Sequence, residues 1–152
     1  MGSPSADAPD AVLHAVLPRP TTASQPFWDG CGRGELLLPH CTACGHIFYF
    51  PRLHCPKCGD REPGWLKSAG RGRIFSFTHV TVSFHGPRWD SQLPYTVVLV
   101  DLDEGPRMLS RLIGDDRHKA ASGDAVEVVF PEVEGQRLPF FRRSPGSSMS
   151  QL

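Results

Sequence analysis

Four cysteines lie within 18 residues of the chain, as two copies of the motif C-x-x-C-G. The first copy contains Cys41 and Cys44, and the second contains Cys55 and Cys58. Two residues between paired thiolates let one tight turn direct both sulfurs at a single ion, and the following glycine permits a left-handed backbone whose N–H groups face sulfur. Four sulfurs suit tetrahedral Zn²⁺ at ~2.3 Å. The spacing therefore predicts a zinc site, with iron as the alternative ion.

The predicted metal site favours a structural role over a catalytic one. A catalytic zinc keeps one coordination position for water or substrate, whereas four thiolates fill all four positions. A ribbon of about 20 residues buries too little apolar surface to fold alone, so the metal would supply its folding energy. The fifth cysteine, Cys31, stands apart and is interpreted as a buried apolar residue. This clustering suits metal binding in a reducing compartment better than disulfides, and we expect a cytoplasmic protein.

No other residue pattern predicts catalysis. The sequence lacks a nucleophile elbow, a P-loop and a G-x-G-x-x-G segment that opens a helix. Asp101, Asp103 and Glu104 form an acidic cluster, which we interpret as the solvated end of a hairpin. We therefore predict no catalytic residues and a chain that is not an enzyme by itself.

Charge is balanced over the whole chain and within its parts. Lys and Arg number 16, as do Asp and Glu, and residues 69–152 contain ten of each sign. A nucleic-acid binder usually concentrates positive charge, so this balance counts against that class. No apolar run approaches the ~20 residues that span a bilayer, and the first 24 residues lack the pattern of a signal peptide. We expect no membrane attachment.

Composition and pattern divide the chain into four predicted segments. Residues 1–24, rich in proline and alanine, are predicted to form a flexible arm. Residues 25–68 are predicted to form a short helix and the zinc ribbon, and residues 69–143 an OB-fold. Residues 144–152 are predicted to be a flexible tail.

The second segment carries signals for both helix and strand. Ser24 is a candidate helix N-cap, and Pro26 suits the first helical turn. We predict a strand at residues 35–40, a hairpin at residues 45–54 inside the metal loop, and a connector at residues 60–71.

After residue 72, runs rich in Val, Ile, Phe and Thr alternate with turn residues, which is typical of an all-β domain. Five short strands, with a polar connection between the third and the fourth, favour a Greek-key barrel of the OB type. An open sheet and an SH3-like barrel are the alternatives. The predicted strands occupy residues 73–84, 95–103, 107–113, 125–131 and 138–142.

An ordered set of short segments accompanies the two cysteine motifs. The segments are Pro26-Phe27-Trp28, Gly34-Glu35-Leu36, Pro51-Arg52, Gly70-Arg71-Gly72, Pro94-Tyr95, Leu102-Asp103-Glu104-Gly105-Pro106, Gly123-Asp124 and Val126-Glu127-Val128-Val129-Phe130. Over about residues 17–143, this combination resembles the family that joins a rubredoxin-like zinc ribbon to an acyl-CoA-associated OB-fold, long catalogued as a domain of unknown function.

The resemblance implies a function as well as a fold. The family is typically found beside thiolase-like enzymes, among them acetyl-CoA acetyltransferases, hydroxymethylglutaryl-CoA synthases and the aldolases of steroid side-chain breakdown. It implies a non-catalytic subunit of a hetero-oligomer, which binds and stabilises such an enzyme and helps form its acyl-CoA site in lipid or steroid metabolism. The family usually has an aliphatic residue at position 31, where this chain has Cys31.

Five residues are candidate contacts for the enzyme or for acyl-CoA. They are Phe27, Trp28, Phe84, Arg88 and Trp89. Tryptophan is enriched at interface hot spots, and an exposed Trp beside an Arg could stack on an adenine ring. For each residue the alternative is packing within the molecule. The alternative function is a single-stranded nucleic-acid-binding module built from the ribbon and the OB-fold.

Overall fold

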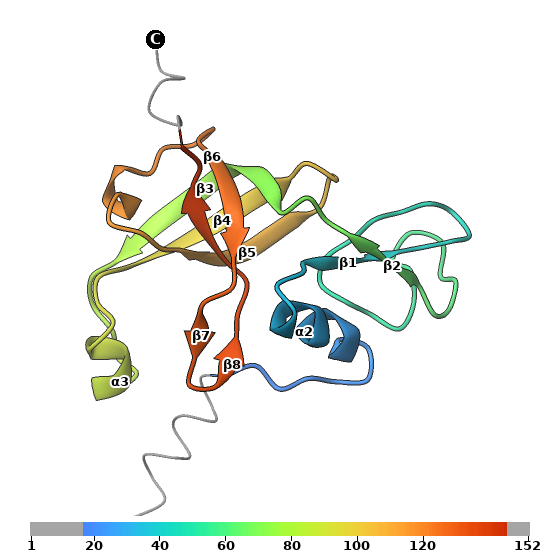
Figure 1. Ribbon diagram of the computed structural model, residues 1–152, viewed down its shortest axis with the longest axis horizontal. Coiled ribbons are helices and arrows are strands. Elements are labelled where there is room, and N and C mark those ends of the chain that lie inside the picture. The colour runs from blue at the N-terminus through green and yellow to red at the C-terminus, as the bar shows by residue number, and fades with distance from the viewer. Residues whose placement is uncertain (1–16, 146–152) are drawn as a thin grey trace, which may run out of the picture.

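The computed structural model describes residues 17–145, and the outer parts of the predicted arm and tail, residues 1–16 and 146–152, lie outside this range. The protein is mostly β, with a short helix and a ribbon followed by a closed five-stranded barrel, as the sequence predicted. Figure 1 shows the ribbon lying beside the barrel, with the helix below the ribbon.

The short helix α2 spans Gln25–Gly32 and buries Phe27, Gly30 and Cys31. Ser24 occupies the N-cap position, but its hydroxyl makes no capping bond to the helix. Instead, Ser24 Oγ accepts a hydrogen bond from the N–H of Thr21 at 2.9 Å. The described end of the predicted arm is therefore hydrogen-bonded to the start of the helix.

The ribbon begins and ends with two antiparallel strands, β1 (Leu37–His40) and β2 (Gly64–Lys67). Strand β2 lies in the segment predicted to be a connector, because a Gly-Trp-Leu-Lys segment behind a proline has too few residues to show alternation. The hairpin predicted at residues 45–54 is wrong. The antiparallel bridges join His40 to Ile47 and His54 to Arg61, so each hairpin surrounds one cysteine motif instead of lying between the two.

The barrel contains five strands in the order β3-β4-β5-β9-β6, and β6 closes it by pairing with β3. The β5–β9 pair is parallel, and all other pairs are antiparallel. This order is that of a Greek-key OB barrel, and closure excludes the open sheet. The strands are β3 (Arg71–Val80), β4 (Tyr95–Leu102), β5 (Arg107–Leu112), β6 (Ala125–Val129) and β9 (Phe140–Arg143).

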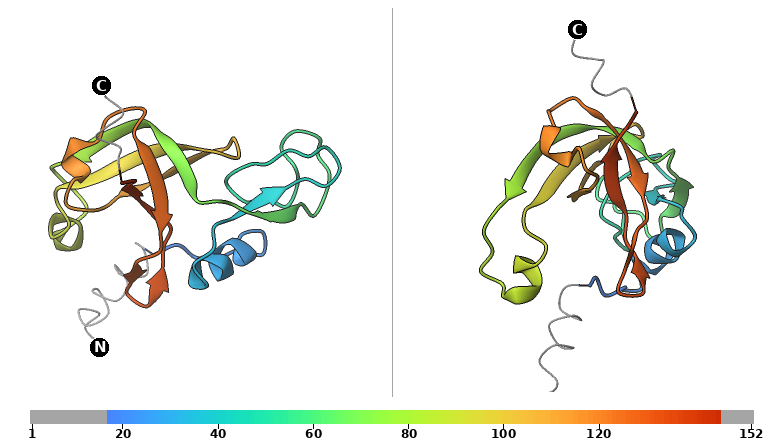
Figure 2. Two further views of the ribbon diagram at one scale, coloured as in Figure 1. Left: turned by 45° about the horizontal axis from the view of Figure 1, so that its top comes forward. Right: turned by 60° about the vertical axis from the view of Figure 1, so that its left-hand side comes forward.

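The connections between the barrel strands contain short helices and a short hairpin. The β3–β4 connection holds helix α3 (Pro87–Asp90), and the polar β5–β6 connection holds the one-turn helix η2 (Arg117–Lys119), close to where a helical turn was expected. Between β6 and β9 lies a hairpin of β7 (Glu132–Val133) and β8 (Gln136–Arg137). Figure 2 shows α3 and this hairpin projecting from the barrel on the same side as α2.

One hydrophobic core connects the helix, the ribbon and the barrel. Phe27, Cys31 and Leu38 belong to the same buried cluster as the barrel residues Val98 and Phe141. Burial of a large apolar side chain stabilises a fold by about 1.5–3 kcal/mol, so this shared core fixes the ribbon against the barrel. The linker between them is also held. The carboxylate of Glu104 accepts hydrogen bonds from the Ser68 hydroxyl at 2.8 Å and from the Ala69 N–H at 2.9 Å.

Within residues 17–145, none of the helices combines the length and the apolar character needed to cross a bilayer.

Candidate metal centre and neighbouring cavity

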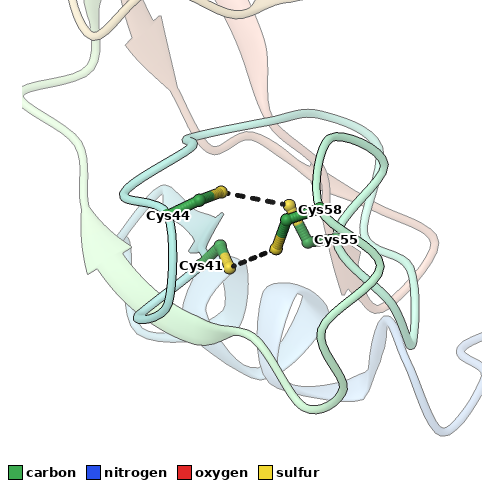
Figure 3. A group of neighbouring side chains, drawn as sticks. All are labelled: Cys41, Cys44, Cys55 and Cys58. Carbon is green, nitrogen blue, oxygen red and sulfur yellow. Dashed lines mark hydrogen bonds between the residues drawn. The ribbon is translucent and has the colours of Figure 1, made fainter.

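The four predicted ligands come together at the end of the ribbon (Figure 3). The sulfurs of Cys41, Cys44, Cys55 and Cys58 all lie within 4.8 Å of one another. The Cys41–Cys58 sulfur pair is separated by 3.5 Å and the Cys44–Cys55 pair by 3.6 Å. Thiolates around a tetrahedral zinc at ~2.3 Å are separated by ~3.8 Å, so these side chains fit such an ion with little movement.

Each cysteine motif folds into the same small turn. In the first, the N–H of Cys41 donates to the carbonyl of His46, and the N–H of Gly45 donates to the carbonyl of Cys41, both at 2.8 Å. The second motif repeats both bonds around Cys55 at 2.9 Å. Gly45 and Gly59 have φ values of +78° and +80°, the left-handed conformation that the sequence predicted for them. The repeat explains how a 19-residue loop directs four sulfurs at one point.

Hydrogen bonds and close packing of the sulfurs affect their ionisation. Burial raises the pKa of the Cys55 thiol, but the N–H groups of Cys58 and Lys57, together with the neighbouring thiols, lower that pKa to about 7. The backbone of Asp60 lowers the pKa of Cys58, but contact with the Cys41 sulfur and its neighbours raises it to about 12. Four thiols this close cannot all ionise unless a cation lies between them. The cluster is therefore positioned to bind a metal ion through sulfur alone.

Cys31 is not part of this cluster; it belongs to α2 and faces the core. The side chain is fully buried, and burial raises the pKa of its thiol to about 12. A thiol with this pKa stays protonated and unreactive at neutral pH. The interpretation of Cys31 as an apolar core residue is confirmed.

Three of the five candidate contact residues meet at one cavity. Trp28 of α2 and Arg88 and Trp89 of α3 line a cavity of about 420 Å³, whose wall also includes residues of the ribbon and the barrel. Phe84 lies outside this cavity, in the β3–β4 connection, and is 94% exposed. Phe27 is fully buried in the core, so its ring packs within the molecule and is not exposed for a contact with a partner.

Other residues of the cavity wall were not predicted from the sequence. Arg111 of β5, Tyr95 of β4 and Phe140 of β9 all line it. They are far apart in the chain and belong to three strands, and only closure of the barrel brings them together. No local spacing signal could have identified them.

Two family models match consecutive parts of the chain. The model described as "ChsH2, rubredoxin-like zinc ribbon domain" matches residues 28–64, which include all four metal-site cysteines. The model described as "ChsH2, C-terminal OB-fold domain" matches residues 65–131. A "DUF35 domain-containing scaffold protein" of Methanothermobacter thermautotrophicus is 35% identical over 104 residues, which cover 66% of this chain and 75% of that protein.

The chain belongs to the DUF35 family. The resemblance found in the sequence is thereby confirmed. The chain is also similar to part of a longer protein. A "Probable enoyl-CoA hydratase alpha subunit" of Thermomonospora curvata is 31% identical over 131 residues, which cover 84% of this chain and 40% of that protein. The present chain thus spans well under half the length of this relative.

A solved structure of a DUF35 protein agrees with the fold over nearly its whole length. The structure described as "Ltp2-ChsH2(DUF35) aldolase" superimposes with a TM-score of 0.74 and 26% identity, covering 84% of this chain and 98% of that chain. The helix, ribbon and barrel of this DUF35 protein are therefore arranged as in a chain solved with an aldolase.

Proposed function

We propose that this protein is a non-catalytic accessory subunit, which binds and stabilises a thiolase-like enzyme and helps form its acyl-CoA site. The observation that carries this proposal is the match to the DUF35 chain of the aldolase, because it extends over both the ribbon and the barrel of one chain. The name of the M. thermautotrophicus relative, a scaffold protein, supports the accessory role. The name of the T. curvata hydratase subunit supports an acyl-CoA substrate.

The metal has a structural role in this proposal. Zinc held by Cys41, Cys44, Cys55 and Cys58 would join the two cysteine turns and would have no coordination position left for a substrate. Beside these residues, the smaller buried cluster of the ribbon contains one large apolar side chain, Phe48. So small a core cannot stabilise two turns, and the ion supplies the missing free energy of folding.

The surface proposed to meet the enzyme or its acyl-CoA comprises Trp28, Phe84, Arg88 and Trp89. Phe84 is 94% exposed and Val82, two residues before it, is 62% exposed. Large apolar groups on a projecting connection lose water-exposed area when a partner covers them, which favours association. Arg88 is ion-paired with Glu134 in the cavity wall, which joins α3 to the β7–β8 hairpin.

Complex formation tests the proposal. We expect this chain, co-expressed with a thiolase-like enzyme encoded beside its gene, to elute with that enzyme as one species on size exclusion. Phe84→Ala should weaken the complex about tenfold or more, because a hot-spot aromatic contributes over about 1.4 kcal/mol. Leu53→Ala is the matched control, because Leu53 is also exposed but is not part of the proposed surface. Separate elution of the two proteins would contradict the proposal.

A further inference from the structure

The cavity beside α2 has the size and lining of a small-molecule site. Its volume of about 420 Å³ lies within the ~300–1,000 Å³ usual for ligand pockets. Aromatic rings from three parts of the fold contribute to the wall: Trp28 from the helix, Tyr49 from the ribbon, and Tyr95 from the barrel. Leu17 and Pro18, at the start of the described chain, also line it.

Three charged side chains line this apolar cavity, and two of them neutralise each other. The guanidinium of Arg88 is ion-paired with the carboxylate of Glu134. The third charged group, Arg111, forms no ion pair with any carboxylate in residues 17–145. The lining thus carries one uncompensated positive charge.

Arg111 is held in a fixed orientation without using most of its hydrogen-bonding capacity. Its guanidinium carbon lies 4.5 Å from the ring centroid of Tyr95 and 5.5 Å from that of Phe140. One N–H donates to Oε1 of Gln92 at 2.8 Å. A guanidinium has five N–H donors in one plane, so several stay available to a ligand. The guanidinium is partly buried, and this burial lowers the pKa of Arg111 from its ordinary value.

A partly desolvated, oriented and unpaired guanidinium in an aromatic cavity favours a particular ligand class. We propose that this cavity binds an organic anion, with its apolar body against Trp28, Tyr49 and Tyr95 and its carboxylate, sulfonate or phosphate on Arg111. Planar bidentate pairing with such groups is characteristic of arginine. The cavity shares Trp28, Arg88 and Trp89 with the surface proposed above for the enzyme or its acyl-CoA. The inference goes beyond that function, because this chain alone builds the site and binding does not require the enzyme.

Two fluorescent probes with nearly the same rings test the inference on the isolated chain. 1-Anilinonaphthalene-8-sulfonate carries an anionic group, and N-phenyl-1-naphthylamine lacks it. We expect saturable binding of both probes to the wild-type chain. Arg111→Gln should weaken the sulfonate about tenfold or more, because a hydrogen bond to a charged group is lost, and should change the neutral probe less than about twofold.

A matched variant and a thermal melt control for effects on folding. Arg73→Gln removes an arginine that donates to the carbonyl of Gly123 and does not line the cavity, so it should leave the affinity of both probes unchanged. Equal weakening of both probes by Arg111→Gln, unchanged affinity for the sulfonate, or the absence of saturable binding would each overturn the proposal. A structural role of Arg111 in the stack with Tyr95 predicts the first of these results.

Competition distinguishes the two natural sources of the anion. Decanoate, decyl phosphate and decanol, each below its micellar concentration, share one alkyl chain and differ in the head group. We expect one or both anions to displace the sulfonate probe at least about tenfold better than decanol. A carboxylate preference identifies a free acid, and a phosphate preference identifies a phosphorylated ligand. Equal displacement by decanol would contradict a role for Arg111. Because the enzyme is absent, failure here leaves the complex experiment unaffected.

Discussion

Replacing Cys44 or Cys58 by serine is expected to remove the metal and unfold the two cysteine turns. Three sulfurs and a hydroxyl bind zinc far more weakly than four thiolates, and structural zinc contributes ~10–16 kcal/mol in zinc-finger peptides. Metal content measured by atomic emission after dialysis against a chelator should fall from about one ion per chain to near zero. Amide hydrogen exchange should accelerate in residues 41–62 while the barrel strands stay protected, because the barrel residues belong to the larger core cluster and the cysteine turns to a separate small one.

Cys31→Ser is the matched control for that experiment. It makes the same chemical change at a buried cysteine outside the metal site. A hydroxyl in the core costs about 1–3 kcal/mol, so this variant should melt at a lower temperature but keep its metal. Normal metal content in Cys44→Ser, or metal loss in Cys31→Ser, would refute the assignment of the four ligands.

Phe27→Ala is expected to be the most destabilising substitution of a single aromatic residue in the ribbon segment. The ring is fully buried and contacts Trp28 and Tyr49, with centroid separations of 4.9 and 5.8 Å. Phe-to-Ala changes in cores cost about 3–5 kcal/mol, which corresponds to a melting temperature lower by roughly 10 °C. Because this core also includes barrel residues, calorimetry should show the whole unfolding transition shifted to a lower temperature.

The same substitution at Phe84 separates folding from association. Phe84 is almost fully exposed, so Phe84→Ala should change the melting temperature by less than about 2 °C, as most surface substitutions do. Phe27 and Phe84 were both predicted to be candidate contacts, and this pair of variants measures how differently they contribute to folding. A large stability loss in Phe84→Ala, or none in Phe27→Ala, would contradict the described core.

Features that depend on local chemistry could be predicted from the sequence. The metal site follows from the C-x-x-C-G spacing, because the turn that directs Cys41 and Cys44 is built from consecutive residues. The barrel strands follow from alternation, as in β4, where every second residue is buried. The bounds of β4 and β5 agree with the prediction to within one residue.

Features that depend on distant neighbours could not be predicted. The β2 strand and the β7–β8 hairpin are too short for an alternation signal and are stabilised by their partners in space. The outcome for Phe27 and Trp28 depended on which side of α2 faces the core, and a helix of eight residues leaves that ambiguous. Arg111 lies on an ordinary strand in the sequence, and its unpaired charge becomes evident only beside Tyr95 and Phe140.

Acyl-CoA turnover by three samples tests the accessory role most directly: this chain alone, the thiolase-like enzyme alone, and the two combined. The accessory role predicts no turnover by the chain, and more turnover or a longer-lived activity in the mixture than with the enzyme alone. Conversion of an acyl-CoA by the purified chain in the absence of the enzyme would contradict it.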